Sequence, residues 1–422
     1  MRDHDKISRF NSDKNNMKPL VIFVQDRFFL GGIEVLELKL VEELARLNYQ
    51  VVVASRDNDT LAKNTSNFTH FIHSGYPDFI SRLPTIINND YKGIIFVSLH
   101  PTAAMAAELA GRKIRKLHKS SPTIYHFHWV SHSRAFFFSQ WLLAQKLYAY
   151  FFKLLPAKST YFMNDASKLA HQSFWRISLD KYPIIRIVGR KTLVKKQIIP
   201  NIGTRIGELR CSDLRIVSVG RLVPFKSYNI NAPSIIRRLL DLGVNVTWDI
   251  WGYGPDEPRI FYKAREQNVA DKIRLLGALP HSEFDETVSA YDVFVGMGTS
   301  VLEAAKTGTP SCVAVENHGD ASYGFLHEAP TDSVGDQVEG FRERRLHEVL
   351  HLFSTLDTDA RAKIGEADAQ AAQQKESTIE NFVGAILSAA PMRQIGLRHW
   401  VTLAIVNVYL KVKHWKRDRM NN

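Results

Sequence analysis

The apolar residues of this chain form short runs separated by longer amphipathic stretches. In the first half these runs are Leu20–Gln25, Val51–Ser55, Thr69–Ile72, Gly93–Leu99, Thr123–His128 and Ser159–Met163. Short apolar runs that alternate with stretches of helix length are typical of parallel strands covered by helices. We therefore predict a parallel sheet with covering helices between residue 20 and about residue 200.

The pattern breaks around Ile199-Pro200-Asn201-Ile202-Gly203 and restarts at Leu214. The runs of the second half are Arg215–Val219, Val246–Trp251, Ile273–Leu276, Val293–Val295 and Ser311–Val315. We predict an α/β chain of two doubly wound, Rossmann-like domains, 19–205 and 206–390. A polar extension, 1–18, precedes them, and a basic amphipathic helix within 391–422 packs back on the first domain or lies at a membrane surface. Ligands of such sheets bind at the carboxyl ends of the strands, so we expect a site in the cleft between the domains.

Composition excludes two broad classes of protein. The 422 residues are 45% hydrophobic and 23% charged, which argues against a disordered chain and against a membrane-spanning one. Only two cysteines are present, and residues 1–18 contain no apolar run of the kind found in a signal peptide. We therefore expect a cytoplasmic protein without disulfides.

The formal net charge of +12 is concentrated in clusters. These comprise Arg112, Lys113, Arg115, Lys116 and Lys119; Arg186, Arg190, Lys191, Lys195 and Lys196; and Lys411, Lys413, Lys416, Arg417 and Arg419. Such clusters suit phosphate groups or an anionic membrane surface, although solvated helix faces can look the same. The clusters are not interleaved with stacking aromatics, and no zinc-ligand spacing is visible, so nucleic acid is not an expected partner.

Two segments of the second half carry the clearest chemistry. Gly220 ends a strand and is followed by Arg221 and Lys226. Arginine as a planar fork and lysine as a point charge can together hold a pyrophosphate. The other segment, Gly296 to Glu303, is predicted to be a turn that leads into a helix. Its Gly298, Thr299 and Ser300 can offer backbone N–H groups and hydroxyls to phosphate oxygens, and Glu303 follows in the first turns of the helix. Together the two segments indicate a site for a nucleoside diphosphate.

A glycine pair occupies the corresponding position of the first half. Gly31-Gly32-Ile33-Glu34 lies between the first strand and a helix predicted from Val35 to Leu47. Two glycines permit a close backbone approach, and the helix N-terminus can present free N–H groups to a phosphate. A tight strand-to-helix turn with no ligand is the alternative interpretation.

With these motifs, roughly residues 20–390 resemble the GT-B nucleotide-sugar glycosyltransferases of the family 4 type. The resemblance implies that Arg221 and Lys226 bind the donor phosphates and that Glu303 accepts hydrogen bonds from the ribose. It also implies that the loop around Leu279 faces the base. A first glutamate, expected eight residues before Glu303, is absent, because Val295 stands there. This departure leaves the identity of the sugar and the stereochemical outcome open.

The resemblance also implies a histidine near the donor sugar at the end of the fifth strand. His126, His128 and His132 fall within a short segment, and we choose His128. His126 and His128 share one strand face, so a metal is conceivable, but no carboxylate stands nearby at ligand spacing. His100, at the end of the fourth strand, is a further candidate that we interpret as structural.

Two apolar stretches bear on the acceptor and on membrane contact. Phe136–Leu155 is aromatic and apolar apart from Ser139, Lys146 and Lys153, and it is too interrupted for a spanning helix. Trp400–Leu410 is similar and is followed by the basic segment Lys411–Arg417. Each can pack in the protein core or lie in a membrane interface.

These observations together predict a cytoplasmic, membrane-peripheral enzyme. We expect it to move a sugar from a nucleoside diphosphate sugar to a growing surface glycan or glycolipid, with retention as the resemblance implies. No cofactor and no metal are expected, since Arg221 and Lys226 can take the place of a divalent ion. Two alternatives remain open: a nucleotide-sugar epimerase or inverting transferase on the same scaffold, and a catalytically silent partner protein in polysaccharide assembly.

Overall fold

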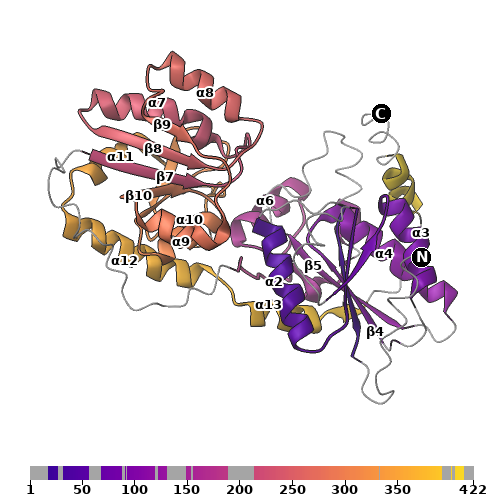
Figure 1. Ribbon diagram of the computed structural model, residues 1–422. Coiled ribbons are helices and arrows are strands. Elements are labelled where there is room, and N and C mark those ends of the chain that lie inside the picture. The colour runs from indigo at the N-terminus through magenta and orange to yellow at the C-terminus, as the bar shows by residue number, and fades with distance from the viewer. Residues whose placement is uncertain are drawn as a thin grey trace. The chain divides into compact units, whose positions relative to one another are not determined.

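The computed structural model comprises two compact units (Figure 1). Unit 1 consists of Met1–Arg186 and Ser377–Asn422, and unit 2 of Ile187–Glu376. The structure describes residues 18–26, 32–56, 68–87, 91, 93–118, 122–130, 149–153, 155–188, 213–331, 333–391, 401 and 404–412. Each unit is built on its own sheet.

The sheet of unit 1 has the strand order β14-β5-β4-β1-β2-β3, and β6 pairs with β5. Its strands are β1 (Leu20–Val24), β2 (Val51–Ser55), β3 (Thr69–Ile72), β4 (Gly93–Ser98), β5 (Thr123–Val130), β6 (Thr160–Phe162) and β14 (Ala390–Pro391). All the pairings are parallel except that of β14 with β5. Every residue of β1, β2 and β4 is buried, as expected for continuous apolar strands with helices on both faces.

The helices of unit 1 are α2 (Gly32–Arg46), α3 (Tyr76–Ile86), α4 (Pro101–Leu117), α6 (Asp165–Trp175) and α13 (Ile379–Leu387). Apolar residues of α3 and α4 pack in one cluster with alternate residues of β1 and β4. α13 packs on α2, and its Phe382 ring lies 5.8 Å from that of Phe127 and 5.2 Å from that of Trp129 on β5. The segment after residue 376 is therefore part of the first unit.

The sheet of unit 2 has the order β13-β12-β11-β10-β7-β8-β9. Its strands are β7 (Asp213–Val219), β8 (Asn245–Trp251), β9 (Ile273–Leu275), β10 (Val293–Gly296), β11 (Ser311–Ala314), β12 (Ala321–Phe325) and β13 (Arg344–Arg345). The pairings from β11 to β9 are parallel, and β12 and β13 extend the sheet antiparallel. The antiparallel edge is the part of this sheet that the apolar pattern did not predict.

Helices cover both faces of this sheet (Figure 1). They are α7 (Ser227–Asp241), α8 (Glu257–Glu266), α9 (Phe284–Ser289), α10 (Thr299–Lys306), α11 (Leu346–Ser354) and α12 (Thr358–Lys375). α7, α8 and α11 pack in one apolar cluster, and α9, α10 and α12 in another. Ile216 belongs to the first cluster and Val217 to the second, because successive side chains of a strand point to opposite faces of the sheet.

The strand orders place a topological switch point in each unit. In unit 2 the chain runs from β7 to β8 and β9 in one direction, and from β10 to β11 in the other. In unit 1 the corresponding neighbours are β1 and β4. Segments that follow such neighbouring strands diverge and leave room for a ligand at the carboxyl edge of the sheet. The two switch points are therefore the places to look for function.

The prediction of a doubly wound α/β chain is confirmed, while the domain boundaries differ from those predicted. The chain enters unit 2 at Ile187 and returns to unit 1 at Ser377, against predicted boundaries at 205/206 and 390/391. The return comes early because α13 buries Phe382 and Ile386 within unit 1. Alternation alone does not reveal which unit a final helix joins.

Several predicted features lie outside the described residues. These are Gly31, Lys119, His132, most of the extension 1–18, the first part of Phe136–Leu155, the basic residues Arg190, Lys191, Lys195 and Lys196, and the basic residues after Val412. Within the described part of the chain, no helix combines the length and the apolar character needed to span a bilayer.

Candidate functional site

Three charged side chains stand at the switch point of unit 2. Arg221 and Lys226 follow β7, and Glu303 lies on α10, which follows β10. β7 and β10 are parallel neighbours, with Ile216 opposite Val293. The segments after these strands therefore emerge at the same edge of the sheet. Among the described residues, none of the three forms a salt bridge or a side-chain hydrogen bond.

Lys226 folds back over the end of β7. Gly220 has φ +152°, and a Cβ at this position would lie 2.6 Å from Lys226 Nζ. The Lys226 N–H donates to Val223 O at 2.9 Å and closes the turn between the strand and α7. Glycine at residue 220 thus suits the backbone conformation, and a side chain there would displace the ammonium group of Lys226.

The environment of Lys226 disfavours its positive charge. Burial lowers the pKa of Lys226 to about 8, and the neighbouring Arg221 contributes to the shift. Arg221 itself is exposed. No described carboxylate pairs with either cation. Two neighbouring cations in this state gain from an anion that binds between them, and a pyrophosphate matches that charge.

The loop after β8 holds the backbone of this turn in place. The Gly220 N–H donates to Trp251 O at 2.9 Å, and the Leu222 N–H donates to Tyr253 O at 3.1 Å. A Cβ on Gly252 would collide with the carbonyl of Gly220. In the segment Trp251–Pro255, the glycine at 252 therefore allows two loops to pack directly against each other. Gly252 therefore has a structural role in the packing of these loops.

The segment from Gly298 to Glu303 begins α10, and some of its hydrogen-bond donors already bind groups within the chain. The Gly298 N–H donates to Val334 O at 2.6 Å, and Ser300 Oγ donates to Met297 O at 3.2 Å. Thr299 and Glu303 are half-buried and have no side-chain hydrogen bond to another described residue. Glu303 and the N-terminus of α10 are thus available to a ligand, while Gly298 and Ser300 help to shape the turn.

Leu279 lies in the loop after β9, at the same edge of the sheet. It is half-buried and packs against the apolar cluster of α9 and α10, as Val219 and Trp251 also do. Gly277, two residues earlier, accepts a hydrogen bond from the Gly252 N–H at 2.5 Å. The loops after β7, β8 and β9 are therefore linked in sequence along the sheet edge.

In unit 1, His128 is part of the interior. Its side chain is 1% exposed, and its Nδ1–H donates to Ser98 O at 2.9 Å. Burial lowers the pKa of His128 to about 3, so its ring is neutral at physiological pH. His126 is also buried, with its Nε2 3.0 Å from Glu108 Oε2. Neither histidine of β5 is exposed as a cleft residue would be.

His100 is the histidine that the switch point of unit 1 presents to solvent. It follows β4, is exposed, and caps α4 by accepting from the Thr102 N–H at 3.3 Å. Its Nδ1 also lies 2.7 Å from Thr102 Oγ1. The sequence contained a signal for this position, because a polar residue before Pro101 and an apolar periodic stretch marks a helix N-terminus after a strand.

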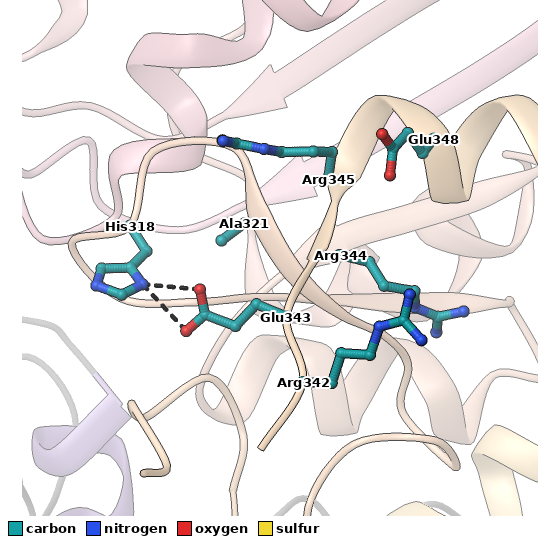
Figure 2. A pocket seen from close by; sticks show the side chains of 7 residues that line it. All are labelled: His318, Ala321, Arg342, Glu343, Arg344, Arg345 and Glu348. Carbon is teal, nitrogen blue, oxygen red and sulfur yellow. Dashed lines mark hydrogen bonds and ion pairs between the residues drawn. The ribbon is translucent and has the colours of Figure 1, made fainter. Parts of the chain in front are cut away.

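A polar hollow beside β12 and β13 of unit 2 provides a contrast (Figure 2). It is lined by His318, Ala321, Arg342, Glu343, Arg344, Arg345 and Glu348. His318 Nδ1 lies 2.8 Å from Glu343 Oε2, and Arg345 Nη1 donates to Asp320 Oδ1 at 2.5 Å. Arg344 pairs with Glu328. Since His318, Glu343, Arg344 and Arg345 have partners within the chain, these side chains have less need of an ionic ligand than Arg221 and Lys226 have.

Among the described residues, no group of three or more histidine, cysteine, aspartate or glutamate side chains could hold a metal ion. An Asp-x-Asp pattern occurs at Asp357-Thr358-Asp359, where Asp357 Oδ1 accepts from the Ala360 N–H at 2.8 Å and caps α12. Two further Asp-x-Asp patterns, 3–5 and 57–59, lie outside the described residues.

Known proteins share this fold and, in part, this sequence. A protein of Escherichia coli (strain K12), the candidate colanic acid biosynthesis glycosyltransferase WcaL, is 27% identical over 163 residues. That match spans 36% of this chain and 38% of the length of WcaL. No family model matches the chain.

Three solved structures are similar to this chain over most of its length. HepE from Anabaena in complex with UDP-glucose superposes with a TM-score of 0.63 at 15% identity and covers 87% of this chain and 99% of its own. Sucrose-phosphate synthase from Thermosynechococcus elongatus gives 0.61 at 14%, covering 87% and 96%. WaaG, a glycosyltransferase involved in lipopolysaccharide biosynthesis, gives 0.56 at 14%, covering 87% and 99%. The chain therefore has the two-domain GT-B fold of these glycosyltransferases.

Proposed function

We propose that this chain is a glycosyltransferase that uses a nucleoside diphosphate sugar as donor. The observation that carries the proposal is the set of charges at the switch point of unit 2, Arg221, Lys226 and Glu303, which have no ionic partner among the described residues. The GT-B fold supports it, as does the UDP-glucose bound by HepE, which has the same fold.

The proposed chemistry follows from the charges. As the bond between the anomeric carbon and the β-phosphate oxygen breaks, negative charge grows on the departing diphosphate. Arg221 and Lys226 stabilise that charge, and preorganised charges of this kind contribute most in the transition state. The N-terminus of α10 adds partial positive charge. Glu303, an acceptor of hydrogen bonds, holds the ribose hydroxyls.

The acceptor supplies a hydroxyl oxygen that forms the new glycosidic bond, and its proton passes to the departing diphosphate. We propose that this acceptor is a growing surface glycan or a glycolipid, at the cytoplasmic face of a membrane. The names of WcaL and WaaG refer to colanic acid and to lipopolysaccharide, both glycans. We further propose that the configuration at the anomeric carbon is retained. We also propose that no divalent metal is required, because Arg221 and Lys226 already neutralise the diphosphate.

The first experiment is a thermal-shift screen of nucleoside diphosphate sugars, followed by product analysis with the stabilising donor and candidate acceptors. We expect one nucleotide class to raise the melting temperature and its sugar to appear in an acceptor product, with EDTA present or absent. A donor that is epimerised without any acceptor would identify an epimerase. Binding without a product from any acceptor would favour the silent partner, and no binding at all would overturn the proposal.

The screen has a matched control within the chain. Arg221→Ala removes an unpaired cation, whereas Arg237→Ala removes a cation of the same unit whose Nη2 pairs with Asp241 Oδ1 at 2.5 Å. The stabilisation by the donor is expected to disappear with the first variant and to persist with the second.

A further inference from the structure

The C-terminal helix of unit 1 is apolar on two sides. Residues 404–412 are helical, and Val406 and Leu410 are buried in the apolar cluster of α3 and α4. Tyr409 packs against the same cluster. These contacts fix the inner side of the helix on unit 1. Such contacts are sufficient to attach a surface helix to a protein core. The opposite side of a surface helix is normally polar.

The outer side of this helix carries a row of exposed aliphatic residues. Val401 is 55% exposed, Ile405 46%, Val408 59% and Val412 41%. Their spacing of four, three and four residues matches the period of an α-helix, so they share one face. Single exposed apolar residues are common on protein surfaces, but a continuous row of them marks an interaction surface. We call this row the outer valine face.

The charge around the outer valine face indicates what covers it. Lys411 is exposed on the same helix. Between residues 393 and 422 the sequence contains seven Lys and Arg residues and one acid, Asp418; the basic residues are Arg393, Arg398, Lys411, Lys413, Lys416, Arg417 and Arg419. An apolar helix face flanked by basic residues matches a bilayer with anionic headgroups. The apolar side chains contact the acyl boundary, and the basic side chains bind the lipid phosphates.

The other apolar stretch suggested by the sequence is less suitable. In the described part of Phe136–Leu155, the side chains of Phe151, Phe152 and Leu155 are buried in the core of unit 1. The Phe152 ring lies 4.9 Å from the Tyr182 ring and 5.0 Å from the Trp175 ring. These residues cannot contact lipid without leaving the core, whereas the outer valine face is already at the surface.

We propose that the outer valine face docks on an anionic phospholipid bilayer. Val401, Ile405, Val408 and Val412 enter the boundary between headgroups and acyl chains, and Lys411, which is exposed on the same helix, binds a lipid phosphate. The helix lies in the interface and does not cross it. This inference rests on the membrane part of the proposed function and is independent of the donor site.

The test is flotation of the full-length protein with vesicles of phosphatidylcholine, with and without phosphatidylglycerol. We expect the wild type to float with the anionic vesicles and to bind less as salt increases. Val408→Glu is expected to lower binding by about tenfold or more, because it places a carboxylate in the apolar boundary next to anionic lipid. Val408→Ser, which adds no charge, should weaken binding in the same direction but less.

Leu352→Glu is the matched control. Leu352 is an aliphatic residue of α11 in unit 2 and is 63% exposed, so its substitution adds the same charge away from the outer valine face. It should leave vesicle binding unchanged. Circular dichroism melts of all variants check that each remains folded, and donor binding by calorimetry reports separately on the nucleotide site.

The possible outcomes separate the inference from the wider proposal. Vesicle binding that is equal for wild type and Val408→Glu would overturn the docking face and leave membrane association standing. No binding of the wild type to anionic vesicles at low salt would overturn both the docking face and membrane association. This holds whether or not calorimetry shows that the protein binds the donor. A dimer in sedimentation that Val408→Glu dissociates, without vesicle binding, would assign the face to a second copy of the chain and overturn the lipid proposal.

Discussion

The ammonium group of Lys226 lies directly against the backbone of Gly220. A Cβ at residue 220 would be 2.6 Å from Lys226 Nζ, and the backbone there has φ +152°. The position of the lysine head group therefore depends on the absence of a side chain six residues earlier. This relationship makes the glycine part of the phosphate site, although it carries no charge of its own.

Gly220→Ala is expected to weaken binding of a nucleoside diphosphate by about tenfold or more. The methyl group would displace Lys226 Nζ, and one charge-assisted contact is worth roughly 1.5–3 kcal/mol. Calorimetry checks the affinity, and a melting curve checks the cost of an alanine at a positive φ. Gly243→Ala on the same unit is the matched control, since residue 243 also has a positive φ of +82° and no atom within 4 Å of an added Cβ. Equal effects of both variants on donor affinity would show that backbone strain, and not the lysine, is responsible.

The pKa of Lys226 leads to a pH dependence with a definite sign. Because its pKa is lowered to about 8, the lysine is cationic below that pH and becomes neutral above it. A bound diphosphate favours the cation and raises this pKa. Affinity should therefore be nearly constant around pH 6.5 to 7, fall by up to about tenfold per pH unit above pH 8, and be accompanied by proton uptake near pH 8.

Calorimetry in buffers of different ionisation enthalpy measures that uptake. In Lys226→Met both the uptake and the decline above pH 8 should disappear. An unchanged pH profile in this variant would assign the titration to another group.

Glu303→Gln is expected to impair binding of the donor without unfolding the protein. The carboxylate has no partner among the described residues, so its loss breaks no ion pair of the fold, and the helix dipole contributes only ~0.3–1 kcal/mol at such a position. The measurement is nucleotide affinity beside the melting temperature. A lower melting temperature with unchanged affinity would mean that Glu303 has a structural role.

His100 and His128 should behave differently when substituted. His100→Ala changes an exposed side chain and should reduce turnover while leaving the affinity for the nucleotide nearly unchanged. Loss of its cap on α4 should cost about 1 kcal/mol of stability. His128→Ala removes a buried ring that donates to Ser98 O and should cost about 2–4 kcal/mol of unfolding free energy. Urea denaturation and initial rates give the two readouts. Full activity of His100→Ala would exclude this histidine from the reaction.

The sequence alone predicts the doubly wound architecture, because the central strands are buried on both faces and form continuous apolar runs. Continuous apolar runs such as Leu20–Val24 and Val51–Ser55 cannot be mistaken for amphipathic helices, and their bounds are those that the structure shows to within one or two residues. The edge strands β12, β13 and β14 were missed because they are short or follow turns. Their assignment depends on tertiary pairing, which no local pattern encodes.

The candidate site was partly predictable for a related reason. Arg221, Lys226 and Glu303 follow strands whose neighbourhood is fixed by the doubly wound order, so a sequence pattern could place them at one edge. The histidine was not predictable in this way. The sequence pattern ends the fifth strand at His128, but β5 continues to Val130 and keeps both His126 and His128 within the sheet. Only His100 follows the end of its strand, and burial distinguishes the two interior rings from this exposed one.

The most direct test of the account is calorimetric titration of a nucleoside diphosphate into the wild type, Arg221→Ala, Lys226→Met and the control Arg237→Ala. Loss of either unpaired cation should weaken binding by about tenfold or more. Lys226→Met should not lower stability, because it removes a charge whose burial is unfavourable in the free protein. The control should bind as the wild type does. Unchanged affinity in both Arg221→Ala and Lys226→Met would contradict the assignment of a diphosphate site to unit 2, and with it the proposed transferase activity.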